Sequence, residues 1–255
     1  MRLHAPPCLR FRLPSLQRYT RNFNMTPRPL GFSTGSLSPG NARQALEMLS
    51  PHATTAIELS ALRTSELAEV LRVAARTDWS PFHYVSFHAP SKFNGITEAQ
   101  VLRKLEPITR KHWPIIVHPD VITDCQAWQQ LGSLVTIENM DGRKPSGRTV
   151  AELEPIFAQL PRAKFCFDIG HAAQIDPTMM LARELVTAFG DRLVEVHLSV
   201  VDDTFAHQPL TVESMKSFAP VLQELVGSPA IILETPVDET TMMQQLRLVS
   251  THRDP

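Results

Sequence analysis

Side chains that can bind a metal ion recur at one kind of position in this sequence, the last residue of a short apolar run. Six of these runs end in a histidine, a glutamate or an aspartate: His88, His118, Glu138, Asp168, His197 and Glu234. His171 follows three residues after Asp168. Imidazole nitrogens and carboxylate oxygens are common ligands of divalent cations. The spacing predicts a metal site, provided that the fold brings the six run ends together.

Convergence of these groups would require a positive partner. Buried carboxylates and imidazoles without one repel each other and lose solvation, which costs several kcal/mol per charge. Lys92 and Arg143 are the only basic residues within five positions after any of the six ends. Singly, each histidine could be a surface residue and each acid a helix cap. Together, they are most simply explained by a divalent cation.

The apolar runs predict eight β-strands, at 30–34, 55–59, 83–88, 114–118, 134–138, 164–168, 193–197 and 230–234. Their continuous apolar character indicates a sheet buried on both faces, and therefore a parallel one. Amphipathic stretches predict helices between the strands, at 41–49, 65–75, 98–110, 124–130, 149–159, 178–189, 212–225 and 239–249. Thr149 and Glu152 have the spacing of a capping box, so we expect a helix to begin there.

Eight strand–helix units within about 225 residues predict an α/β fold, a single-domain (β/α)8 TIM barrel over residues 27–252. A doubly wound open sheet is the alternative. The turn after the first strand, Thr34-Gly35-Ser36, lacks the GxGxxG pattern that would support it. In a barrel every strand end opens onto one mouth, so residues far apart in sequence would share one cavity.

Composition and charge narrow the class of protein. The 255 residues are 43% hydrophobic and 20% charged, which is typical of a globular protein with a large core and no membrane span. Residues 1–24 hold five arginines and no acid, so residues 1–26 are expected to be a disordered or mis-started N-terminal tail, with Met25 as the alternative start. Without those arginines, 20 basic residues face 26 acidic ones, a balance of about −6 that argues against a nucleic-acid partner.

The three cysteines, Cys8, Cys125 and Cys166, are far apart and lack zinc-binding spacing. They predict reduced thiols in a cytoplasmic protein, with Cys166 acting as a small core hydrophobe. The sequence leaves a homo-oligomer open.

The strand-end motifs resemble those of a known superfamily. They are Phe87-His88-Ala89-Pro90, Val117-His118-Pro119, Ile137-Glu138-Asn139, Asp168-Ile169-Gly170-His171, Val196-His197-Leu198 and Leu233-Glu234. In this order on successive strands they resemble the xylose isomerase-like TIM barrel superfamily, over residues 30–250. That superfamily groups sugar phosphate isomerases and epimerases with endonuclease IV.

The resemblance implies a metal-dependent isomerase or epimerase of a small sugar, sugar phosphate or hydroxy-carbonyl compound. Glu138, Asp168, His197 and Glu234 would bind a divalent metal, Mn²⁺, Mg²⁺, Co²⁺ or Zn²⁺ by ligand type. Glu138 and Glu234 would also be the catalytic acid and base on either side of a cis-enediolate. Further substrate contacts would come from His88, His118 and His171.

The endonuclease IV branch implies the alternative, a zinc-dependent phosphodiesterase acting on abasic-site DNA. There His88 and His118 would join Glu138 in holding a second metal, and His171 and His207 would hold a third. The third site in that branch also uses an Asp-x-His element, but Phe205 stands two residues before His207. This departure weighs against a third metal.

Two features leave alternatives open. Glu58 interrupts the second apolar run, so it either faces the mouth and binds substrate or forms an ion pair with Arg63. The segment 139–148 carries Arg143, Lys144 and Arg148. These cations either bind a phosphate or carboxylate of the substrate or lie on a solvated loop.

Overall fold

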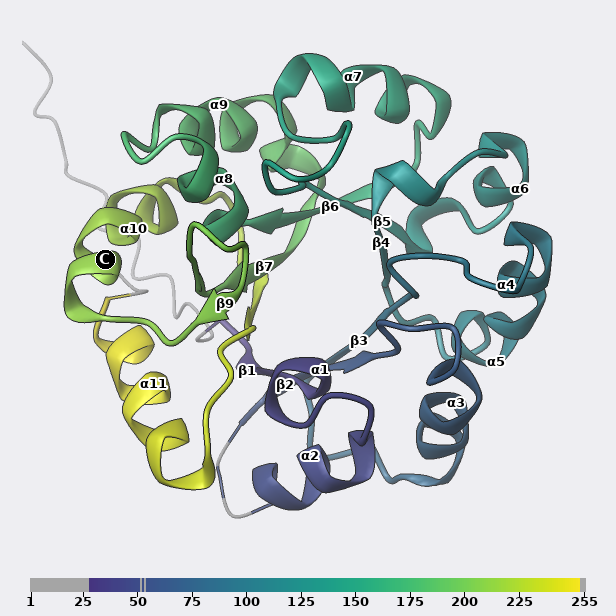
Figure 1. The fold of residues 1–255 in the computed structure, drawn as a ribbon, viewed down its shortest axis with the longest axis horizontal. Coiled ribbons are helices and arrows are strands. Elements are labelled where there is room, and N and C mark those ends of the chain that lie inside the picture. Colours follow the sequence, from purple (N-terminus) through teal and green to yellow (C-terminus); the bar gives the residue numbers. More distant parts are fainter. Residues whose placement is uncertain (1–27, 51, 53, 253–255) are drawn as a thin grey trace, which may run out of the picture.

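The chain forms a closed barrel with helices around it (Figure 1). The computed structural model describes residues 28–252 except 51 and 53, so the expectations for the tail and for Cys8 lie outside the described residues. The barrel strands are β1 (Leu30–Ser33), β2 (Ala56–Ser60), β3 (Tyr84–His88), β4 (Ile115–Val117), β5 (Val135–Glu138), β6 (Lys164–Asp168), β7 (Leu193–Leu198) and β10 (Ala230–Leu233).

Each barrel strand runs parallel to its two neighbours, in the order β1-β10-β7-β6-β5-β4-β3-β2, and β1 pairs with both β2 and β10 to close the ring. All eight predicted strands and the predicted barrel are confirmed. The register places the strand ends at similar heights, because Ser60 pairs with His88 and Asp168 pairs with His197. The mouth is therefore built from the carboxyl ends of the strands, as the spacing predicts.

The helices surround the strands, with each predicted helix present. They are α1 (Thr34–Leu37), α2 (Ala42–Leu49), α3 (Leu67–Arg76), α4 (Glu98–Lys104), α5 (Glu106–Thr109), α6 (Cys125–Gln129), α7 (Val150–Gln159), α8 (Ile169–Ile175), α9 (Met180–Phe189), α10 (Val212–Glu224) and α11 (Glu239–His252). Three short 3₁₀ turns, η1 (Pro119–Val121), η2 (Gly132–Leu134) and η3 (Gly190–Arg192), join some of these elements.

The structure departs from the predicted helices in three places. The stretch 98–110 is two helices, α4 and α5, because Pro107 lacks an N–H and its ring disfavours a continuous helix. Helices α1 and α8 are absent from the sequence-based expectations, since both are short. Thr149 does cap α7 by accepting the N–H of Glu152 at 3.4 Å, but the carboxylate of Glu152 binds Arg148 instead of completing the box.

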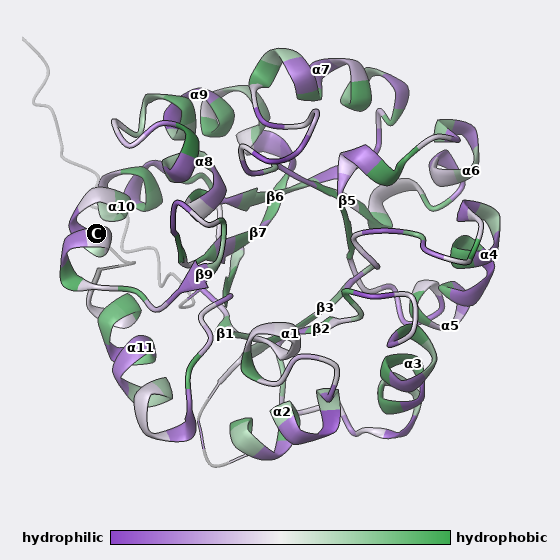
Figure 2. Cartoon of the chain, in the orientation of Figure 1, coloured by the Kyte–Doolittle hydropathy of each residue, from purple (hydrophilic) through white to green (hydrophobic). Residues whose placement is uncertain are grey.

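Apolar side chains fill the space between the helices and the outer face of the barrel, and the outer helices carry hydrophobic and hydrophilic residues on different faces (Figure 2). Cys166 is fully buried, as predicted. Inside the barrel, Ala56, Ala230 and Ile232 form a small apolar cluster at the floor. Above that floor the interior is polar, with Glu58, Glu195 and Thr136 fully buried. A polar interior is unusual for barrel packing, and it lies directly beneath the mouth.

Two shorter strands, β8 (Val200–Val201) and β9 (His207–Gln208), form an antiparallel hairpin after β7 that the sequence pattern did not predict. Figure 1 shows this hairpin beside α8 at the mouth. Among the described residues, no helix combines the length and the apolar composition needed to cross a bilayer.

Candidate metal centre

Four of the predicted metal ligands meet at the mouth of the barrel. One ligand atom each of Glu138, Asp168, His197 and Glu234 can be chosen so that all four lie within 4.8 Å of one another. Glu138, Asp168 and His197 are 0–1% exposed, and Glu234 is 12% exposed through its side chain. The site is therefore closed on the barrel side and open toward the mouth.

The ring of His197 is held so that one nitrogen faces this group. Its Nδ1 lies 3.2 Å from Glu138 Oε1 and 3.5 Å from Glu234 Oε2. Its Nε2 points down the barrel, 3.2 Å from both Glu58 Oε2 and Glu195 Oε1. Carboxylates at the far nitrogen of a metal-binding histidine fix its tautomer and orient the near nitrogen. Nδ1 is thus the atom of His197 that is placed for a metal.

Asp168 provides the test of whether a cation fits. Its Oδ1 accepts the N–H of His171 at 2.7 Å, which caps the start of α8. Its Oδ2 is buried and has no hydrogen-bond partner within the described part of the chain. A buried carboxylate oxygen without a partner, beside two further carboxylates, is a costly arrangement that a divalent cation would relieve. The donor set, three carboxylates and one imidazole, fits such a cation.

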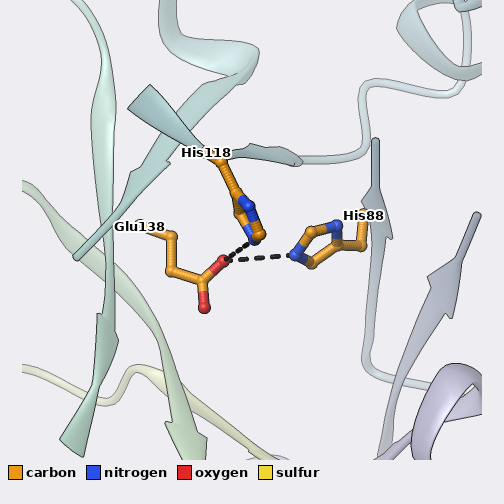
Figure 3. Close-up of side chains that lie close together, drawn as sticks. All are labelled: His88, His118 and Glu138. Atoms are coloured by element: carbon orange, nitrogen blue, oxygen red, sulfur yellow. Dashed lines mark hydrogen bonds and ion pairs between the residues drawn. The ribbon is translucent and has the colours of Figure 1, made fainter. Parts of the chain in front are cut away.

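A second group of donors shares Glu138. The Nε2 atoms of His88 and His118 each lie 3.2 Å from Glu138 Oε2, and the two rings approach this carboxylate from β3 and from the end of β4 (Figure 3). His88 Nδ1 lies 2.7 Å from the carbonyl of Ala89, so this nitrogen carries a proton, and Nε2 is the nitrogen that faces Glu138. His118 differs, because its Nδ1 lies 3.2 Å from the ammonium of Lys144.

That lysine contact sets the tautomer of His118. An ammonium can only donate, so Nδ1 of His118 accepts and the proton of the neutral ring lies on Nε2, facing Glu138. Burial and the nearby cations lower the pKa of His118, which fits a neutral ring. In this state His118 is a hydrogen-bond donor to Glu138. Metal binding at its Nε2 would require loss of the Lys144 contact.

A third group contains Asp168, His171 and His207. His171 Nδ1 donates to the carbonyl of Asn139 at 2.9 Å, and His207 Nδ1 lies 2.8 Å from the hydroxyl of Ser199. Asp202 does not reach this group, because its carboxylate accepts from the backbone of Thr204 and Ala206 in the β8–β9 turn. Asp202 therefore does not complete the weak third site expected from Phe205, and the further carboxylate near His171 is that of Asp141, whose Oδ2 lies 3.9 Å from His171 Nε2.

Burial and mutual charge shift the pKa values of the site in different directions. Burial raises the pKa of the Glu234 carboxyl despite the opposing effect of His197. Burial acts the same way on Glu138, but His197 and His118 outweigh it and hold the pKa of Glu138 well below its usual range. Burial disfavours a charged His88, yet Glu58 and Glu138 raise the pKa of His88 to about 9. The two glutamates therefore differ in their tendency to hold a proton.

Sequence reasoning missed Glu195, which lies on β7 two residues before His197. Its carboxylate accepts from Tyr84 at 2.7 Å and from Ser86 at 3.1 Å, and it contacts His197. The signal was present in the sequence. Residues two apart on a strand face the same side, so Glu195 shares the barrel interior with His197.

Glu58 also lies inside the barrel, 0% exposed, with Ser60 donating to it at 2.8 Å. Arg63 does not reach Glu58, since it pairs with Glu66 at 3.3 Å. Burial opposes the charged form of Glu58, but His197 and His88 lower its pKa to about 2. Glu58 therefore lies beneath the site and affects it through its contact with His197.

A cavity of about 370 Å³ lies above the donor groups. Its lining residues are Ser33, Gly35, Ser36, Pro39, Leu62, His88, Ser91, His118, Glu138, Arg143, His207, Glu234 and Pro236. The predicted substrate contacts His88 and His118 are among them, whereas Glu58 and His171 are not. This volume suits a small ligand.

The three cations of the segment 139–148 all have acidic partners. Arg143 pairs with Asp141 at 2.7 Å, Lys144 with Asp120 at 2.8 Å, and Arg148 with Glu152 at 2.6 Å. Each pair cancels a positive charge locally, so the segment offers no strongly basic surface. Arg143 alone among the three lines the cavity.

No protein-family model and no curated protein matches the chain. Among solved structures it is similar to endonuclease IV from Thermus thermophilus, with 20% identity, a TM-score of 0.57, and 88% of this chain and 98% of that chain covered. SacUVDE is similar over 88% of this chain and 98% of that chain, with 14% identity and a TM-score of 0.54. A xylose isomerase-like TIM barrel protein from Mycobacterium smegmatis, in complex with magnesium, has 11% identity and a TM-score of 0.55 over 89% of this chain and 98% of that chain. At these identities the likeness is one of fold.

Proposed function

From the premise that the chain has the fold of the xylose isomerase-like TIM barrels, we propose that it is a divalent-metal-dependent isomerase or epimerase of a small sugar, sugar phosphate or hydroxy-carbonyl compound. The observation that carries this proposal is the meeting of Glu138 and Glu234 at one nitrogen of His197, inside one cavity. Both glutamates line that cavity, so both can reach a bound substrate.

The positions of the two glutamates suit proton transfer on two sides of a planar intermediate. Glu138 ends β5, Glu234 follows β10, and these strands are three steps apart in the ring. One of the two carboxylates would take the proton beside the carbonyl, and the other would return a proton to the opposite face. A cis-enediolate would form between these steps. A divalent cation held by Glu138, Asp168, His197 and Glu234 would polarise the substrate oxygens.

The surroundings favour a small substrate. The cavity of about 370 Å³ is within the range of small-molecule sites. The nearby cations are each paired with an acid, which weakens attraction for a nucleic-acid backbone.

A second candidate is a zinc-dependent phosphodiesterase that acts on abasic-site DNA. One observation favours it, the convergence of His88 and His118 on Glu138, which could hold a second ion. Two metals about 4 Å apart are a common arrangement for phosphoryl transfer. The contact between Lys144 and His118 weighs against it, because it places a proton on the nitrogen that would bind the ion.

The experiment measures deuterium incorporation from heavy water into a panel of ketoses, sugar phosphates and hydroxypyruvate. The metal-loaded protein should exchange a carbon-bound proton of at least one compound and hold one tight metal ion per chain. Exchange should be lost in Glu138→Gln and in Glu234→Gln. Glu154→Gln is the matched control, because Glu154 is exposed on α7 and remote from the cavity.

A nicking assay on abasic-site DNA runs beside the exchange assay. Two tight metal ions, with nicking that requires His88 and His118 and no exchange on any compound, would reject the isomerase in favour of the phosphodiesterase. Exchange that continues at full rate in Glu234→Gln would reject the two-glutamate mechanism while leaving the substrate class intact.

A further inference from the structure

We propose that Arg143 binds an anionic group of the substrate, so that the compound on which this site acts carries a phosphate or a carboxylate. This inference rests on the proposed function, and it deepens that function by naming a chemical class. Its support is the set of contacts that Arg143 makes at the wall of the cavity.

Arg143 is the cation that the fold directs to the cavity. Its side chain is 51% exposed and lines the cavity together with Glu138, His207 and Glu234. No other arginine or lysine lines the cavity within the described ranges. The remaining lining groups are carboxylates, imidazoles, hydroxyls and apolar side chains. Arg143 is therefore the lining group that is always protonated, and Asp141 balances its charge from one edge.

The guanidinium is held in one orientation. Its Nε and Nη2 donate to the carboxylate of Asp141 at 3.2 and 2.7 Å, and its carbon lies 5.1 Å from the centre of the Phe205 ring. Asp141 is itself buried, with 2% side-chain exposure. The third nitrogen, Nη1, has no hydrogen bond among the described residues. A guanidinium fixed on one edge presents its other edge ready for a carboxylate or phosphate, with little further loss of side-chain entropy.

The loop that carries Phe205 is built to keep the ring in place. Phe205 has a φ of 64°, a left-handed backbone conformation that is unfavourable for a bulky residue. Asp202 stabilises this turn by accepting from the N–H groups of Thr204 at 2.8 Å and Ala206 at 3.0 Å. The strained backbone therefore serves to place an aromatic ring against Arg143.

The backbone at Gly142, next to Arg143, is held in place as well. The N–H of Gly142 donates to Gln174 at 3.1 Å. A Cβ at Gly142 would lie 3.0 Å from the Gln174 side-chain oxygen and 3.5 Å from the Phe205 ring, so both side chains pack closely on the backbone at Gly142. Residues from three separate segments thus hold a single guanidinium at the cavity wall.

The hydroxyl groups that line the cavity already donate to other groups. Ser36 donates to the carbonyl of Ser33 at 2.9 Å, and Ser91 donates to the carbonyl of Leu62 at 3.1 Å. Ser60 donates to Glu58, so Ser33, 2.6 Å away, donates to Ser60. The protons of these hydroxyl groups are engaged in hydrogen bonds within the protein, whereas an anion must accept hydrogen bonds from free donors. An anionic substrate would therefore lie with its charged group at Arg143 and its reacting carbons toward Glu138 and Glu234.

The test is isothermal titration calorimetry of the metal-loaded full chain with two probes, inorganic phosphate and acetate. Arg143→Ala should bind at least one of them about tenfold more weakly than the parent protein, the loss expected for a charged hydrogen-bonding group. Arg148→Ala is the matched control, because Arg148 lies in the same segment, pairs with Glu152 and does not line the cavity. The anion whose affinity falls identifies the group as phosphate or carboxylate.

Arg143→Ala leaves the buried Asp141 without its partner, so Arg143→Lys is measured beside it. Lysine keeps a positive charge near Asp141 but lacks the planar fork, and it should also bind the probe more weakly than the parent. The proposal is overturned if Arg143→Ala binds the anion as tightly as the parent protein does. If Arg143→Ala does not fold, the same result in Arg143→Lys overturns it. A parent protein that binds neither probe overturns it as well.

The calorimetry needs no turnover, so the two proposals fail in different ways. If the isomerase proposal is wrong, deuterium exchange is absent but anion binding still depends on Arg143. If the Arg143 proposal is wrong, the Arg143 variants bind the anion as the parent does and exchange continues.

Discussion

At the scale of single residues, the site depends on which nitrogen each histidine presents. His197 faces the carboxylate group with Nδ1 because Glu58 and Glu195 face its Nε2. His88 presents Nε2 because its Nδ1 donates to a backbone carbonyl, and His118 holds a proton on Nε2 because Lys144 donates to its other nitrogen. Two histidines that look equivalent in sequence therefore differ in readiness to bind a metal.

The first prediction concerns Glu138, which belongs to both donor groups. Glu138→Gln removes a charged oxygen ligand and the partner of four histidines. We expect a folded protein whose metal affinity falls by more than about a hundredfold, since loss of a mere supporting group already costs ten- to a hundredfold. Metal content after gel filtration measures this, with the exposed Glu154→Gln as control. A full metal complement in Glu138→Gln would disprove the site.

The second prediction concerns pH in the metal-free protein. The pKa of His88 is raised from 6.5 to about 9, so its stabilising contribution is complete below about pH 6.5 and is lost as the pH rises through 9. The pKa of Glu58 is lowered from 4.5 to about 2, so its contribution is complete above about pH 4.5 and is lost as the pH falls through 2. We expect the melting temperature to be highest between these limits.

Metal binding should show the opposite trend on the alkaline side, because a histidine must lose its proton to bind a metal. Affinity measured by chelator competition should increase between about pH 6 and pH 9, while the melting temperature of the metal-free protein decreases. A metal affinity that stays constant over this range would contradict the raised pKa of His197, the histidine of the four-residue metal site.

At the scale of elements, short segments beyond the main helices shape the mouth. Asp168 both ends β6 and caps α8, so the same residue sets the helix start and offers an oxygen to the metal. Helix α8 in turn brings His171 back over the site. The β8–β9 hairpin brings His207 to the cavity and the Phe205 ring against Arg143. Each of these segments is too short to be recognised by periodicity.

The third prediction tests the approach of α8 to the end of β7. A Cβ at Gly170 would lie 2.6 Å from the carbonyl oxygen of Ser199, which is too close for any real contact. Gly170→Ala should lower the free energy of unfolding by about 1–3 kcal/mol, measured by denaturant titration, and should weaken metal binding by displacing the Asp168–His171 turn. Gly190→Ala is the control, because nothing lies within 4 Å of its Cβ position. Equal stability of the two variants would show that α8 can shift without cost.

At the scale of the whole molecule, closure of the ring decides which residues meet. Strands β5 and β10 are about 95 positions apart in sequence, yet the ring places Glu138 and Glu234 at one imidazole. Acidic groups dominate this interior, and the barrel as a whole carries a negative balance. The overall charge and the site chemistry therefore both favour a cation as the first ligand.

The fourth prediction concerns residues 1–24, which carry five arginines and no acid. The barrel closes between β1 and β10 without any of these residues. A chain that begins at Met25 should therefore melt within a few degrees of the full chain, as measured by calorimetry, and should keep its metal content. A large loss of stability would show that the removed segment packs on the barrel.

The sequence by itself determined the eight strands and the residues at their ends. Local apolar composition is enough to predict the strands, because a strand that is buried on both faces is apolar along most of its length. Polar residues are then expected at the end of the strand. Glu58 and Glu195 are acidic residues within strands. For Glu195, only the structure shows Tyr84 and Ser86, more than 100 positions away, that make its burial tolerable.

Only the tertiary structure decided which side chains contact one another. The contact of Lys144 with His118, the pairing of Arg143 with Asp141 under the Phe205 ring, and the separation of Glu58 from Arg63 are set by loop paths and by barrel closure. Hydrogen bonds and ion pairs act over a few ångströms, while the positions that make them lie tens of residues apart. Local pattern therefore predicts which residues reach the mouth, and the closed ring decides what each of them can do there.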